Sequence, residues 1–133
     1  HATFDHDLVE AVRKHVPIEI VEESDPLRLK SVIGRCDAVF SSRFHGLVNA
    51  LSQGVPVIAT GWSHKYRHLL DEYGVPEALV EPTRPGSLAR SVDAMLSAGA
   101  YEDAKARIEA GAAWNKEQSR DMWARIDAYA ERR

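Results

Sequence analysis

Two polar loops contain the residues of this chain that are best suited to binding a charged ligand. The first, Ser41-Ser42-Arg43-Phe44-His45, follows the apolar run 38–40, and the second, 60–66, follows the apolar run 55–59. A helical pattern begins at each loop, and the first turn of a helix offers unpaired N–H groups and a partial positive charge to an anion. Arginine, lysine, histidine and serine at these places favour a small anion that carries phosphate or carboxylate groups. The candidate ligand-binding residues are therefore Ser41, Ser42, Arg43, His45, Ser63 and Lys65.

The spacing of apolar residues predicts strands that alternate with helices. Short apolar runs bounded by breaker residues predict strands at 18–21, 37–41, 55–60 and 78–81. Periodic apolar positions and capping residues predict helices over about 4–15, 26–34, 44–53, 65–73, 85–97 and 101–133. This alternation is typical of an α/β fold with a Rossmann-like parallel sheet and flanking helices.

The predicted topology places the two polar loops at one edge of the sheet. Ligands of open parallel sheets bind at the carboxyl ends of the strands, where both loops begin. We expect residues 1–99 to form the α/β domain, without its first strand, and residues 100–133 to form a helical segment, with Gly111 as a break. That segment is expected to pack on the domain or on an N-terminal domain that lies outside this chain.

Composition narrows the class of protein. The chain has 133 residues and a net charge of −3 without a long block of like charge, which argues against a nucleic-acid partner. It has no apolar run near the roughly 20 residues that span a membrane. The single cysteine, Cys36, excludes an internal disulfide, favours a reducing compartment and is predicted to be a small core residue. His64 and His68 are four residues apart but have no suitably spaced third ligand, so no metal site is predicted.

The run from Ser41 to Ala59, followed by 61–66 and Tyr73-Gly74, resembles the C-terminal half of the polysaccharide pyruvyl transferase family. The shared pattern is an arginine, any residue and a histidine at a helix start, then Gly-x-Pro before a strand and a lysine that enters the next helix. The resemblance implies a two-domain fold of the glycosyltransferase-B (GT-B) type, of which this chain would be most of the second domain. It also implies transfer of the enolpyruvyl unit of phosphoenolpyruvate to two hydroxyls of a sugar, with release of phosphate.

In the family, the arginine and histidine are associated with binding phosphoenolpyruvate and with catalysis, and these roles map onto Arg43 and His45; the family's lysine maps onto Lys65. His45 is the candidate general acid. No cofactor is implied beyond phosphoenolpyruvate as donor, and the acceptor would be a sugar or a lipid-linked glycan. We expect a cytoplasmic enzyme of exopolysaccharide or cell-wall biosynthesis that could work at the inner face of the membrane. The general base and most acceptor contacts are expected on the other domain, so this chain alone could be inactive.

Two alternatives remain open. A GT-B type glycosyltransferase or a sugar-nucleotide epimerase would bind a nucleotide diphosphate at the same helix start. Such a site usually has a carboxylate in the first turns to hold a ribose, whereas this chain offers Arg43, His45 and Asn49 there, which favours a small anion. A non-catalytic α/β scaffold domain is the second alternative, and it predicts no specific anion binding.

Overall fold

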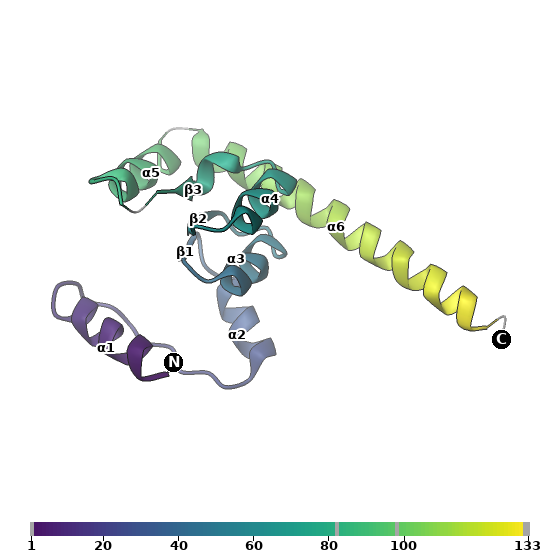
Figure 1. Ribbon diagram of the computed structural model, residues 1–133, viewed down its shortest axis with the longest axis horizontal. Helices are drawn as coiled ribbons and strands as arrows, with labels where there is room; N and C mark the ends of the chain where they lie inside the picture. Colours follow the sequence, from purple (N-terminus) through teal and green to yellow (C-terminus); the bar gives the residue numbers. More distant parts are fainter. Residues whose placement is uncertain (1, 82, 98, 132–133) are drawn as a thin grey trace.

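Three short parallel strands form the sheet at the centre of the fold (Figure 1). The computed structural model describes residues 2–81, 83–97 and 99–131. The strands β1 (Val39–Ser41), β2 (Val57–Thr60) and β3 (Leu79–Val80) lie in the order β1-β2-β3. Val39 pairs with Val57, and Ala59 pairs with Leu79. Helices connect and flank these strands, so the predicted α/β class with a Rossmann-like parallel sheet is confirmed.

The helices follow the predicted order. Their bounds are α1 (Ala2–Arg13), α2 (Pro26–Ile33), α3 (Phe44–Leu51), α4 (His64–Glu72), the short 3-10 helix η1 (Pro76–Ala78), α5 (Ser87–Met95) and α6 (Ala100–Ala130). The Asp25 side chain accepts a hydrogen bond from the Leu27 N–H at 2.8 Å, which caps α2 as expected for a residue that precedes Pro26. Gly54 and Gly74 follow α3 and α4 with φ values of +80° and +70°, a conformation that glycine adopts without strain.

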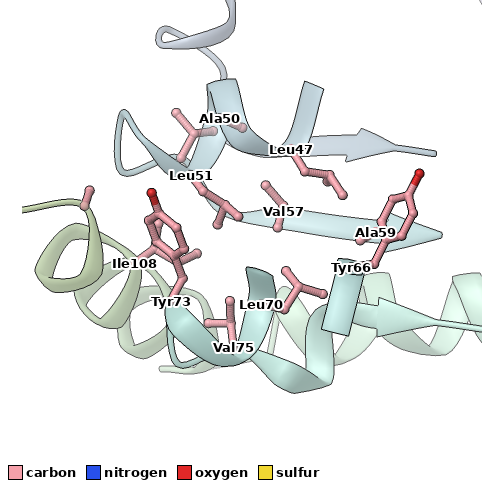
Figure 2. Packing of buried hydrophobic residues seen from close by; sticks show 12 residues of the cluster. Leu47, Ala50, Leu51, Val57, Ala59, Tyr66, Leu70, Tyr73, Val75 and Ile108 are labelled. Carbon is pink, nitrogen blue, oxygen red and sulfur yellow. The ribbon is translucent and has the colours of Figure 1, made fainter. Parts of the chain in front are cut away.

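The hydrophobic core lies between β2 and the helices α3, α4 and α6. All four residues of β2 are buried. Figure 2 shows Leu47 and Leu51 of α3 together with Val57 of β2, Leu70 of α4 and Ile108 of α6 in one cluster. Because β2 is covered on both sides, it has the continuous apolar sequence of a buried parallel strand.

The strand predicted at Ile18–Val21 does not form. These residues are irregular, and Ile18, Ile20 and Val21 are exposed. A strand needs a neighbour to pair its N–H and C=O groups, and among the described residues the sheet contains only β1, β2 and β3. The β-branched residues of this segment favour a strand. The segment does not form one, because it has no neighbouring strand to pair with.

Cys36 is exposed, so its predicted place in the core is wrong. It lies in the turn between α2 and β1, three residues before β1 begins at Val39. Its thiol is directed at the end of α2, where Sγ lies 3.6 Å from the Val32 carbonyl oxygen.

Gly111 does not break α6, which runs without interruption over 31 residues. A Cβ atom at this position would lie 3.1 Å from Cδ1 and 3.2 Å from Cα of Tyr73. The glycine thus permits a close approach between α6 and the end of α4, and burial there raises the pKa of the Tyr73 hydroxyl despite its hydrogen bond with Asn115.

Only the first half of α6 packs against the sheet domain. Ile108 and Ala112 are buried, whereas Trp114, Met122, Trp123 and Ile126 are exposed. Figure 1 shows the yellow end of α6 extending away from the rest of the chain. In the part of the chain that the structure describes, no helix is long and apolar enough to cross a membrane.

Arg107 holds α6 against the loop that follows α4. Its Nη2 lies 2.6 Å from Glu77 Oε1 and 2.9 Å from Asp103 Oδ2, and its Nη1 donates to the Gly74 carbonyl. Burial would raise the pKa of Glu77, but the hydrogen bond and positive charge of Arg107 outweigh it and hold that pKa below its usual value.

We expect Glu77→Gln to lower the free energy of unfolding at pH 7 by at most about 1 kcal/mol, because this pair is largely solvent-exposed. Folding lowers the pKa of Glu77, so its contribution is complete above the unfolded-state pKa and is lost as the pH falls through the folded-state value. Urea titrations at neutral pH and at about pH 3, below the ordinary glutamate pKa of about 4.3, check this. Glu117→Gln, an exposed change farther along α6, is the control. If the free energies of unfolding of the wild type and Glu77→Gln differ by the same amount at both pH values, the prediction is wrong.

Candidate functional site

The two polar loops lie in contact at the carboxyl ends of the strands, as the topology predicted. The Tyr66 hydroxyl, on the first turn of α4, donates a hydrogen bond of 2.9 Å to the Ser42 carbonyl oxygen. The Phe44 and Tyr66 rings meet edge to face with their centroids 5.6 Å apart. Figure 2 shows Tyr66 near the tips of the strand arrows, with its hydroxyl oxygen directed toward the end of β1.

Ser41 shapes the first loop. Its Oγ accepts a hydrogen bond from the Arg43 N–H at 3.0 Å and donates one to the Arg43 carbonyl at 3.1 Å. A Cβ on Gly46 would lie 2.8 Å from this Oγ, so the glycine leaves room for the hydroxyl. Arg43 occupies the N-cap of α3 with an extended backbone, and both Arg43 and His45 are exposed there. The Ser41 hydroxyl is thus engaged in forming the turn that presents these two side chains.

The second loop is shaped by Gly61. A Cβ at this position would lie 2.6 Å from atoms of the Tyr66 ring, so any side chain there would displace the ring. Ser63 is the N-cap residue of α4, where it makes no side-chain capping bond, and Trp62 beside it is 97% exposed. The Gly61 backbone therefore packs closely on the Tyr66 ring, and this contact holds the loop against α4.

Lys65 connects the two loops electrostatically. Its Nζ lies 4.8 Å from the centroid of the Phe44 ring and 5.7 Å from that of Tyr66. Phe44 stands between Arg43 and His45 in the sequence, and its ring meets the His45 ring edge to face at 6.1 Å. A cation over an aromatic face gains about 0.5–1 kcal/mol at an exposed site. The structure therefore brings His45 and Lys65 to the Phe44 ring, directly after Arg43 at the N-cap of α3. Cations gathered at one helix start suit a ligand with two anionic groups.

A hollow of about 910 Å³ lies next to this cluster, at the carboxyl ends of β2 and β3. Ser42 and Ser63 line it, but Ser41, Arg43, His45 and Lys65 do not. Thr60, Trp62 and His64 also line it; they belong to the loop 60–66 that the sequence identified, but were not named as ligand-binding residues. Sequence reasoning missed three further residues of the lining, Arg67, Glu81 and Thr83. The rule that parallel strands end at one edge could have found Glu81 and Thr83, because Glu81 is the last residue of the strand predicted at 78–81 and Thr83 follows it.

Within the described ranges, no group of three or more His, Cys, Asp or Glu side chains is placed to hold a metal ion. His64 and His68 lie on one face of α4, and their rings meet edge to face at 5.7 Å.

The fold and site together define an α/β domain that presents cations and hydroxyl groups at the carboxyl ends of its strands. A sequence profile of the polysaccharide pyruvyl transferase family matches residues 5–64, and the resemblance seen in the sequence is confirmed over that span. The matched span includes Arg43 and His45 and ends one residue before Lys65. The match covers less than half of the chain and indicates a transferase of the general kind that the family's description names. No solved structure matches the chain significantly.

We expect Tyr66→Phe to lower the free energy of unfolding by about 1 kcal/mol, the usual cost of a lost hydrogen bond. It should also loosen the first loop, because that loop loses its attachment to α4, so the backbone amides of residues 42–45 should exchange with deuterium faster. Tyr101→Phe is a matched control, since the Tyr101 hydroxyl donates a similar bond of 2.8 Å to the Asp37 carbonyl at the opposite end of β1. Urea unfolding and amide exchange check both variants. Equally faster exchange of residues 42–45 in the two variants would show that the effect is general destabilisation.

Proposed function

We propose that this chain binds phosphoenolpyruvate and is the donor-binding part of a pyruvyl transferase that forms a ketal on a sugar. The observation that carries the proposal is the cationic cluster at the start of α3: Lys65 and His45 lie at the Phe44 ring, and Arg43 precedes Phe44 as the N-cap residue. Phosphoenolpyruvate has a phosphate ester and a carboxylate attached to the same carbon, C2. Arginine pairs with either group through two parallel hydrogen bonds, and lysine adds a point charge.

The proposed reaction begins with proton transfer from His45 to the methylene carbon of phosphoenolpyruvate, which leaves positive charge at C2. One sugar hydroxyl forms a bond to C2 and releases its proton. The bond from C2 to the phosphate oxygen then breaks, and inorganic phosphate leaves with its electron pair. A second hydroxyl of the sugar forms the other C–O bond of the ketal and releases its proton. Of the two protons that the acceptor releases, one replaces the proton that His45 gave to carbon and the other is taken up by the departing phosphate, so the reaction balances.

The three residues divide two roles between them in this scheme. Arg43 and Lys65 neutralise the phosphate as charge builds on the leaving oxygen, which is the step where preorganised cations contribute most. His45 supplies the proton. The family resemblance further implies a GT-B type partner domain, and we propose that the general base for the sugar hydroxyl comes from it.

Calorimetric titration of phosphoenolpyruvate and, separately, of uridine diphosphate tests the proposal. We expect saturable binding of phosphoenolpyruvate and a loss of about tenfold or more in Arg43→Ala, because a hydrogen bond to a charged group is worth about 1.5–3 kcal/mol. Arg120→Ala, which removes an exposed arginine from the outer half of α6, should bind as the wild type does. His45→Gln should retain most of the binding of phosphoenolpyruvate, because the proposed role of His45 is proton transfer.

Preferential binding of uridine diphosphate would instead favour the sugar-nucleotide alternative. An equal loss of affinity in Arg43→Ala and Arg120→Ala would contradict a specific role of the Arg43 loop.

A further inference from the structure

We propose that the hollow at the ends of β2 and β3 binds the sugar acceptor, with Trp62 as the surface on which the sugar ring stacks. This inference rests on the proposed function, because it assigns the second substrate of the same reaction. Trp62 is 97% exposed, although a tryptophan normally buries much of its large apolar surface. Among the described residues Trp62 takes part in no hydrogen bond or ring contact. Packing of the fold therefore does not explain why a tryptophan stands at this position.

The lining of the hollow matches the chemistry of a sugar. A pyranose ring has a flat face of C–H groups and a rim of hydroxyls, each of which both donates and accepts hydrogen bonds. The indole of Trp62 offers a flat apolar surface on which the C–H face of the sugar can stack. Arg67 provides donors, the Glu81 carboxylate provides acceptors, and the hydroxyls of Ser63 and Thr83 provide both.

Glu81 argues against an anionic occupant. Its carbonyl oxygen accepts a hydrogen bond from the Ser87 hydroxyl at 2.6 Å, which holds the chain at the end of β3. Its carboxylate Oε1 lies 3.4 Å from the Thr83 hydroxyl. A carboxylate at this edge accepts hydrogen bonds from neutral hydroxyls and repels a phosphate. Because Arg67 also lines the hollow, the charges of its lining balance, whereas the cationic cluster has Arg43 and Lys65 without a carboxylate in the same loops. The hollow and the cluster therefore differ in charge, as expected for one site that takes two chemically different substrates.

The two sites are close enough to share a reaction. Ser42 lines the hollow and is followed directly by Arg43, and Ser63 lines it two residues before Lys65. Tyr66 forms part of the wall, and its ring also contacts Phe44 at the centre of the cationic cluster. The volume of about 910 Å³ is in the range of small-molecule sites and accommodates one or two sugar rings.

Tryptophan fluorescence tests the inference directly. The chain has three tryptophans, so the double variant Trp114→Phe/Trp123→Phe leaves Trp62 as the sole tryptophan. In this background we titrate uncharged methyl glycosides of glucose, galactose, mannose and N-acetylglucosamine, their disaccharides, and uridine. We expect a saturable change of Trp62 fluorescence with at least one of the sugars. The further change Glu81→Gln should weaken that response at least fivefold.

Binding of phosphoenolpyruvate to the wild type, Trp62→Ala and Trp114→Ala separates this inference from the proposed donor site. We expect all three to bind phosphoenolpyruvate equally, while Trp62→Ala loses at least tenfold in sugar affinity measured by calorimetry and Trp114→Ala loses none. Phosphoenolpyruvate binding without any sugar response would overturn the acceptor site and leave the donor site standing. A response to uridine alone would overturn it in favour of a nucleoside site.

Discussion

The hydrogen bond between the Tyr66 hydroxyl and the Ser42 carbonyl is the contact on which the candidate site depends. It joins the loop after β1 to the helix after β2, so that cations from two separate segments lie around Phe44. Gly61 makes the contact possible, because no side chain fits between its backbone and the Tyr66 ring. Ser41 and Gly46 maintain the other half of the arrangement by shaping the turn at Arg43. Small residues thus set the positions, and large polar residues supply the chemistry.

Local signals in the sequence predict most of the elements. Asp25, Pro26 and Gly34 mark the ends of α2, and Gly54 and Gly74 mark the exits of α3 and α4, because each requirement is met within a few residues. The failures have non-local causes. The segment 18–21 is not a strand because pairing depends on a neighbour, and Gly111 does not end α6 because it allows Tyr73 to approach. Cys36 is exposed because the turn that carries it lies outside the packed layers.

The sequence also predicted only part of the candidate site, because the missed part depends on contacts between distant segments. Arg43, His45 and Lys65 were found because helix starts after buried strands are recognisable from one sequence. The hollow beside them was not found, because its lining combines the loop 60–67 with Ser42 and with residues 79–83, which are distant from it in the sequence. The role of Ser41 in the turn also required coordinates, because a serine before a helix has the same signature whether it binds a ligand or its own backbone. The division at residue 99 and the roles of the site residues stay predictions.

The length of α6 implies a gradient of local stability along a single helix. Ile126 lies 18 residues, or five turns, beyond Ile108 and therefore on the same face, yet it is 46% exposed whereas Ile108 is 1% exposed. The amides near Ile108 can exchange with deuterium only when the core opens. Those near Ile126 belong to a solvated helix whose stability depends on local propensity alone, and such a helix is marginal in water. Amide exchange should therefore become progressively faster from the middle of α6 toward its end, within one unbroken element of secondary structure.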